Sequence, residues 1–357
     1  MKKKLNEPQI IALLITDLHR HEDNGSVIDK VFETVIKTCN VLSIKHIFNA
    51  GDNFHSRKGQ LQNILVGFEK NLDSLEEAGI IMHCIPGNHD KSDYNLEDSF
   101  LNPYKHSPAL NLIKNPSGVL LNDIMFHLIP FFDEKGLYVE KLKSYVESVP
   151  NVLNKYSGKN VLITHIGING VRTNAGHIYE NSLIYKDLFK PFDKVLVGHF
   201  HDKTDLGENI HYVGATIQHN YREDVDKGIV AIYDDLSVGY IPVDFPKYKV
   251  FEYDIADIKN KKLIANLIEE IELGNHIRIV LQGDDREIKA VDLTEIKLLG
   301  IDVKRKSEIN ISDNDEQLIE LIEFDSKKIV EEFKSFCEKE KLDTNKGLEY
   351  LKEINIQ

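Results

Sequence analysis

The sequence predicts an α/β protein whose main domain is built of layers. Short runs rich in β-branched residues alternate with helical patterns, and these runs are apolar throughout, as strands buried on both faces are. The five runs span residues 10–16, 46–50, 81–86, 160–165 and 194–199. Strands that alternate with helices in this way form sheets whose faces are covered by helices.

Two amphipathic helices are expected between the first three strands. In each, apolar residues recur three and four positions apart, which places them on one helix face. The first face contains Ile28, Val31, Phe32, Val35, Ile36 and Cys39, and the second contains Leu61, Ile64, Leu65, Phe68, Leu72 and Leu75. Gly79 suits the position just after the end of the second helix.

The rest of the chain divides into three parts. Strands expected at 210–217, 228–234 and 238–245 complete a first domain, residues 1–246. Residues 247–311 alternate strand and helix and form a small αβ domain. Residues 312–357 contain an acidic linker and two amphipathic C-terminal helices, which pack either on a partner protein or back on the small αβ domain.

Composition restricts the class of protein. With 41% hydrophobic and 29% charged residues in 357, the chain has the balance of a globular protein, and no apolar run is long enough to span a bilayer. Three cysteines without paired spacing indicate neither a disulfide framework nor a zinc cluster, so a reducing cytoplasm is expected. The net charge of −14 argues against nucleic-acid binding over the whole surface, but not against a local basic groove.

Polar side chains follow each of the five predicted strands. They are Asp17 and His19, Asp52, Asn88, His165, and His199 and His201. The carboxyl ends of strands are where sites form in open α/β sheets, so these loops are expected to meet. In Asp-X-His and His-X-His, alternation of side chains along an extended segment places both ligands on one side.

This set of donors predicts a pair of metal ions. Imidazole, carboxylate and amide ligands suit Mn²⁺, Fe²⁺ or Zn²⁺, and the lack of thiols argues against a structural zinc site. The ligands exceed the needs of one ion, whereas two ions sharing Asp52 would use them all. Such a pair activates water and offsets charge on a phosphoryl group, so phosphoester hydrolysis is the expected chemistry.

The chain has 15 histidines, and most are expected to be ordinary. Isolated histidines are usually satisfied core or surface residues. Those assigned to this class are His46, His83, His106, His127, His211, His219 and His276. The tetrapeptide GNHD at 87–90 is different, because it stands in order between the other metal-ligand motifs.

The ordered motifs TDLH, GDNF, GNHD, THIG and GHFH resemble those of the calcineurin-like metallophosphoesterases and cover residues 15–202. The resemblance implies a four-layer α/β/β/α sandwich with a binuclear metal site. It implies that Asp17, His19 and His201 hold one ion, that Asn88, His165 and His199 hold the other, and that Asp52 bridges them. His89 would assist the leaving group, oriented by a carboxylate such as Asp90.

Within that superfamily, GDNFH at 51–55 looks like the motif of SbcD-type DNA repair nucleases rather than the Asp-Arg-Gly motif of protein phosphatases. His55 would then position the DNA. The resemblance implies a Mn²⁺-dependent 3′-to-5′ exonuclease and single-strand endonuclease in which a hydroxide shared by two ions attacks phosphorus. It also implies an SbcC-like SMC-family ATPase partner docked on the C-terminal helices, with the small αβ domain capping the DNA. The short chain looks most like a phage or bacterial version, for which a cytoplasmic location is expected, in the host if the protein is phage-encoded. A homodimer, through the early helices or otherwise, stays open.

Two alternatives stay open. The first is a phosphatase or cyclic-nucleotide phosphodiesterase of the same superfamily, and the second is an interaction subunit that has lost catalysis. Five basic residues near the site loops would either contact phosphates or be ordinary surface residues. These are Arg57, Lys58, Arg172, Lys203 and Arg222.

Overall fold

The computed structural model describes residues 7–148, 158–173, 177–258, 261–283, 288, 291 and 293–306. The predicted linker and C-terminal helices at 312–357 lie outside these residues. The five strands predicted at the site are present within one or two residues. They are β1 (Ile10–Ile15), β2 (His46–Asn49), β3 (Ile81–Cys84), β7 (Lys159–His165) and β8 (Lys194–Gly198).

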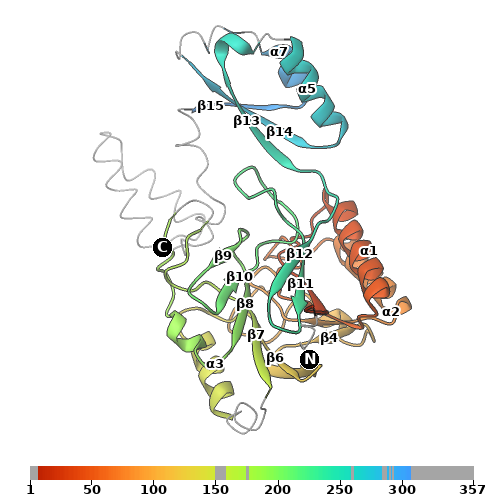
Figure 1. The fold of residues 1–357 in the computed structure, drawn as a ribbon, viewed down its shortest axis with the longest axis vertical. Helices are drawn as coiled ribbons and strands as arrows, with labels where there is room; N and C mark the ends of the chain where they lie inside the picture. The colour runs from red at the N-terminus through yellow and green to blue at the C-terminus, as the bar shows by residue number, and fades with distance from the viewer. Residues whose placement is uncertain are drawn as a thin grey trace, which may run out of the picture. The chain divides into compact units, whose positions relative to one another are not determined.

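The strands form two six-stranded sheets (Figure 1). The first has the order β12-β11-β1-β2-β3-β4, with β1 to β4 parallel and β11 and β12 forming an antiparallel extension next to β1. Its remaining strands are β4 (Leu110–Leu112), β11 (Ile229–Tyr233) and β12 (Val238–Ile241). The second has the order β5-β6-β7-β8-β10-β9, and its remaining strands are β5 (Ser117–Leu121), β6 (Ile124–Ile129), β9 (Thr204–Asp205) and β10 (Ile210–Tyr212).

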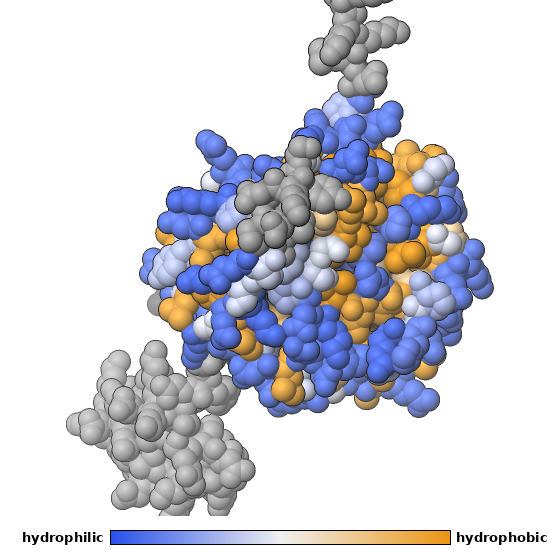
Figure 2. Space-filling model, turned by 90° about the horizontal axis from the view of Figure 1, so that it is seen from below, coloured by the Kyte–Doolittle hydropathy of each residue, from blue (hydrophilic) through white to orange (hydrophobic). Residues whose placement is uncertain are grey.

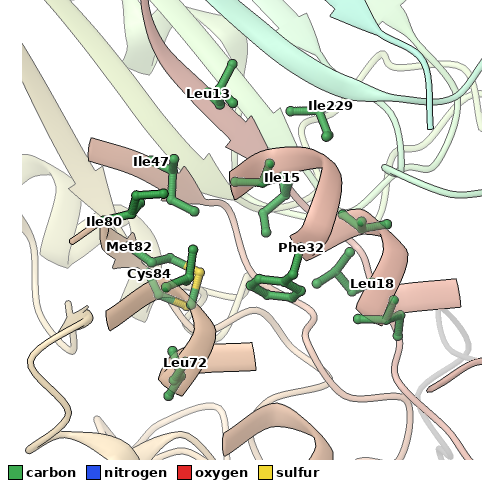
Figure 3. Packing of buried hydrophobic residues seen from close by; sticks show 14 of the residues in the cluster. Leu13, Ile15, Leu18, Phe32, Ile47, Leu72, Ile80, Met82, Cys84 and Ile229 are labelled. Atoms are coloured by element: carbon green, nitrogen blue, oxygen red, sulfur yellow. The ribbon is translucent and has the colours of Figure 1, made fainter. Parts of the chain in front are cut away.

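Two helices cover the outer face of the first sheet, as predicted. They are α1 (Gly25–Leu42) and α2 (Gln62–Glu77). Figure 3 shows Ile15 of β1 and Ile47 of β2 on the side of the sheet that faces Phe32 of α1 and Leu72 of α2. All four side chains are almost fully buried, so the predicted helix faces are correct apart from Leu61, which precedes α2 and is 55% exposed.

The two sheets pack against each other through a second core. It joins Leu14 of β1 and Phe48 of β2 to Phe126 of β6, and the Phe48 and Phe126 rings lie 4.6 Å apart. Helix α3 (Leu137–Ser148) lies on the other side of the second sheet, where the Tyr138 hydroxyl is 2.8 Å from Thr164 Oγ1. The order helix, sheet, sheet, helix is the predicted four-layer sandwich.

A third, three-stranded sheet follows the sandwich. It contains β13 (Tyr248–Asp254), β14 (His276–Gln282) and β15 (Asp302–Arg305), with α5 (Lys261–Glu272) and α7 (Thr294–Leu298). It has its own apolar core, which includes Leu267 and Ile279. The predicted alternation of strand and helix is therefore present in this part of the chain.

Three short 3₁₀ helices complete the secondary structure of the described residues, at Asn102–Tyr104, Lys186–Phe189 and Ile255–Asp257. None of the helices in the described ranges is long and apolar enough to cross a membrane. Figure 2 shows both hydrophilic (blue) and hydrophobic (orange) residues on one face of the molecule, as is usual for a protein surface.

Candidate metal centre

All five motif loops meet at the carboxyl ends of the parallel strands. The loop after β1 carries Asp17 and His19, the loop after β2 carries Asp52, and the loop after β3 carries Asn88. His165 ends β7, and His199 and His201 follow β8. Six of these seven side chains are buried and His199 is partly exposed. The structure therefore brings together all seven residues predicted to bind metal.

The first ligand group consists of Asp17, His19 and His201. The Nε2 atoms of the two imidazoles are 3.1 Å apart, and Asp17 Oδ1 lies 4.0 Å from His19 Nε2 and 3.9 Å from His201 Nε2. Three potential ligand atoms thus converge within reach of a single cation.

The second ligand group consists of Asn88, His165 and His199. Asn88 Oδ1 is 2.9 Å from His165 Nε2 and 3.1 Å from His199 Nδ1. Asp52 lies between the groups, because its Oδ2 is 3.2 Å from His165 Nε2 and 3.6 Å from His19 Nε2. One carboxylate oxygen therefore reaches both groups, which is the position that a bridging ligand requires.

The backbone at these ligands is unusual. Asp17, His19, Asp52 and His199 all have positive φ, between 44° and 96°, although none is glycine. Such conformations cost on the order of 1 kcal/mol each and concentrate at functional sites. Backbone hydrogen bonds hold two of them, from Asp17 N to Gly51 O and from His19 N to Asp52 O, both 3.0 Å long.

Glycines let the loops approach closely. A Cβ on Gly51 would lie 2.6 Å from Gly87 N, and a Cβ on Gly198 would lie 2.8 Å from His165 Nδ1. Gly51 also has a φ of 98°, which side chains rarely adopt. The motif glycines are therefore required by contact between loops and not only by turns within one loop.

The electrostatics of the cluster favour added positive charge. Burial opposes protonation of His165, but the carboxylates of Asp52 and Asp17 outweigh it and raise the pKa of His165 to about 9. Burial lowers the pKa of His19 and of His199, so both imidazoles stay neutral, the form that binds metal. Divalent cations would supply directly the charge that the carboxylates attract.

The residues present fit a pair of divalent cations. His19 Nε2 and His201 Nε2 face each other beside a carboxylate, and His19 Nδ1 is a buried nitrogen with no hydrogen-bond partner among the described residues. Four imidazoles, two carboxylates and an amide match the donors preferred by Mn²⁺, Fe²⁺ or Zn²⁺.

His89 and His55 lie at the edge of this cluster. The His89 ring is 4.5 Å from that of His19 and 6.0 Å from that of His55, which is exposed. His89 Nδ1 is 2.5 Å from the carbonyl of His55, and His89 Nε2 is 3.0 Å from Arg57 Nη2. Arg57 can only donate, so Nε2 accepts and Nδ1 carries the proton.

The position of Asp90 differs from the expectation. In the described part of the chain its carboxylate does not contact the His89 ring; it accepts from the backbone N–H groups of Asn53 (2.9 Å), Phe54 (3.2 Å) and Gly87 (3.0 Å). Unpaired backbone donors in these tight loops require an acceptor, and Asp90 satisfies three of them. Asp90 thus ties two site loops together instead of orienting His89.

Two residues next to the centre were not predicted from the sequence. The buried carboxylate of Glu223 is 2.8 Å from His201 Nδ1, and His219 Nε2 is 2.7 Å from the carbonyl of Asp17. His219, expected to be ordinary, lies with its ring 5.0 Å from those of both His19 and His201. Neither residue belongs to a motif, and only the return of the chain before β11 brings them here.

Comparison with known proteins agrees with this architecture. Residues 12–203 match the family model described as "Calcineurin-like phosphoesterase". The chain is 23% identical over 300 residues to "Putative phosphoesterase 244L" of Invertebrate iridescent virus 6, covering 78% of this chain and 95% of that protein.

Two shorter matches are to proteins named as nucleases. "Exonuclease subunit 1" of Enterobacteria phage T4 is 25% identical over 171 residues, 46% of this chain and 45% of that protein. A subunit of the SbcCD nuclease of Staphylococcus saprophyticus is 24% identical over 221 residues, 57% of each chain. The matched family region spans more than half of the chain and contains all seven predicted ligand residues, so the protein belongs to the calcineurin-like phosphoesterase family.

Proposed function

We propose that the protein is a metal-dependent DNA nuclease subunit with 3′-to-5′ exonuclease and single-strand endonuclease activity. The observation that carries this proposal is the placement of His55. Its exposed imidazole follows the buried Phe54 and lies beside His89 at the edge of the ligand cluster, 5.9 Å between ring centroids from His19. A polynucleotide strand can reach such a side chain from solvent while its phosphate occupies the centre.

The chain's own residues divide the work of diester hydrolysis. When bound, two divalent cations supply Lewis acidity that activates water and offsets charge on the phosphoryl group. Asp17, His19 and His201 would hold one cation, Asn88, His165 and His199 the other, and Asp52 both. His89 acts at Nε2: once this nitrogen is released by Arg57 it takes up a proton from solvent, and the resulting imidazolium donates that proton to the departing 3′ oxygen.

The contact between Arg57 and His89 supports this role of His89. Its guanidinium lies against His89 Nε2, and a guanidinium binds phosphate oxygens better than it binds a neutral imidazole. A substrate phosphate therefore takes over this donor and leaves Nε2 available to the leaving group. In the described part of the chain, the contact of Arg57 with a site imidazole supports a phosphate-binding role for this residue.

The remaining parts of the proposal concern metal and partners. We propose Mn²⁺ as the metal, an SbcC-like SMC-family ATPase as partner, homodimerisation through the early helices and a cytoplasmic location. The matches to "Exonuclease subunit 1" of the phage and to the SbcCD nuclease protein support the class of complex. An ATPase that shares DNA binding also accounts for a nuclease with a net charge of −14.

The proposal is tested with the purified full-length chain and Mn²⁺ on end-labelled duplex and circular single-stranded DNA. We expect 3′-to-5′ shortening of the duplex and cutting of the circle. Asp52→Asn, which replaces the shared carboxylate, should lower both rates by more than roughly 100-fold. DNA left intact by a metal-loaded parent, alone or together with an SbcC-like ATPase, would contradict the proposal.

A second candidate function is hydrolysis of small phosphoesters, as a phosphatase or cyclic-nucleotide phosphodiesterase. The match to a protein named "Putative phosphoesterase 244L", which covers 78% of this chain, supports this second candidate function. Chromogenic mono- and diesters of p-nitrophenol separate the two. A nuclease prefers the diester strongly, whereas a phosphatase prefers the monoester.

A further inference from the structure

A carboxylate from outside the five motif loops contacts one of the metal-group imidazoles. Glu223 Oε1 is 2.8 Å from Nδ1 of His201, whose Nε2 faces Asp17 and His19 in the first ligand group. The two nitrogens of His201 are therefore divided between Glu223 and the candidate metal position. Glu223 is 4% exposed, so water does not compete for this contact.

The Glu223 side chain is held from several directions. Asn220 Nδ2 donates to Oε1 at 2.8 Å, and the backbone N–H of His219 donates to Oε2 at 3.0 Å. Lys227 Nζ lies 3.6 Å from Oε2 and also donates to the carbonyl of His201. The carboxylate and the backbone of His201 are thus fixed by the same short segment.

This arrangement determines the tautomer of His201. A carboxylate only accepts, so Nδ1 of His201 carries a proton, and in the neutral ring Nε2 presents its lone pair to the first ligand group. A carboxylate behind a ligating imidazole also increases the donor strength of that imidazole and fixes its ring orientation.

The two ligand groups differ in this respect. His165 of the second group lies 2.8 Å through Nδ1 from the neutral carbonyl of Ala50. Within the described residues, Glu223 is the one carboxylate that contacts the outer nitrogen of a metal-group imidazole. Any effect of Glu223 on metal binding should therefore be confined to the first ligand group.

We propose that Glu223 is a positioning residue that fixes His201 in the tautomer with Nε2 free and strengthens the first of the two metal sites selectively. This inference rests on the metal pair of the proposed function. It does not depend on whether the substrate is DNA or a small phosphoester.

The test is calorimetric titration of the metal-free full-length chain with Mn²⁺. The parent should bind two ions, and Glu223→Gln should weaken one of them by about 10–100-fold while leaving the other unchanged. Glu134→Gln is the matched control, because Glu134 accepts hydrogen bonds from Gly167 N and the Tyr179 hydroxyl instead of from a metal-group imidazole. Equal affinities for both ions in Glu223→Gln and parent would overturn the proposal, as would equal weakening of both.

A second measurement needs no stable variant at position 223. In nitrogen-15 spectra of the full-length parent loaded with diamagnetic Zn²⁺, the His201 ring, assigned by comparison with His201→Gln, should be protonated at Nδ1. Protonation at Nε2 would refute the role of Glu223. A parent that binds no divalent ion would instead remove the metal pair itself, so the two failures are distinguishable.

Discussion

A Cβ atom placed on Gly87 would lie 2.1 Å from Oδ1 of Asp52, far inside van der Waals contact. The loop after β3 therefore touches the carboxylate that both ligand groups share. Asp52 Oδ1 also accepts from the backbone N–H of His89 at 2.8 Å. The GNHD motif thus positions Asp52 through its backbone in addition to supplying Asn88 as a ligand.

Gly87→Ala should displace Asp52 and reduce metal binding, because the added methyl group has no room. Gly87 does not have a positive φ, so the expected cause is the clash with Asp52 and not backbone strain at position 87. We expect fewer than two Mn²⁺ ions bound at concentrations that saturate the parent, measured by calorimetry. Gly136→Ala is the control, because a Cβ there meets nothing within 4 Å. Two ions bound to Gly87→Ala with parental affinity would show that the loop shifts at no cost.

His89→Ala should retain metal but lose its assistance to the leaving group. A general acid increases the reaction rate by roughly 10²–10⁴-fold, and the increase is largest when the leaving group is poor. We therefore expect a large loss of kcat on DNA and a much smaller loss on bis(p-nitrophenyl) phosphate, whose leaving group needs no proton. An equal loss on both substrates, at parental metal content, would rule out proton donation by His89.

Arg57→Ala should weaken substrate binding and leave both metal sites intact. Its guanidinium contacts Nε2 of His89 and also lies against the side-chain amide of Asn88. Removing a positive charge there does not oppose cation binding, so we expect kcat/KM to fall about 10–100-fold, mainly through KM. Arg57→Lys, which keeps the charge but not the planar fork, should recover part of the loss. A fall in Mn²⁺ affinity instead would assign Arg57 to the metal centre.

Acid should destabilise the fold through His83, which lies on β3 away from the centre. Burial, with His46 adjacent, lowers the pKa of His83 to about 4. The unfolded chain then binds the proton more tightly, so this contribution is present above pH 6.5 and is lost as the pH falls toward 4. It amounts to about 2 kcal/mol between pH 7 and 5.

Urea unfolding of the parent and His83→Gln at pH 7 and pH 5 measures this effect. Both proteins lose stability from other groups, but the difference between them should shrink by about 2 kcal/mol at pH 5. If the difference in free energy of unfolding between the two proteins did not change with pH, the pKa of His83 would be the same in the folded and unfolded chains.

The strands that neighbour the site were easier to predict than the hairpin β5–β6. The five site strands are apolar runs that end in motif residues, so pattern and chemistry indicate the same segments. The hairpin was missed, although its turn is Asn122-Asp123 with φ of 48° and 60° at the two residues. Two left-handed residues in a two-residue loop are characteristic of a type I′ turn. The strand after the turn, Ile124–Ile129, is strongly apolar, so a local signal for this hairpin was present.

The sequence by itself determined the α/β class and the order of the five motifs, and it predicted the seven side chains that the structure gathers, because apolar periodicity and ordered motifs are local properties of the chain. Only the tertiary structure decided which side chains hold the ligand loops and the outer nitrogens of the imidazoles. Asp90 binds backbone donors of a neighbouring loop, and Glu223 reaches His201 from a segment 22 residues away. Such contacts depend on which loops the sheet order brings together, and no spacing along the chain encodes that proximity.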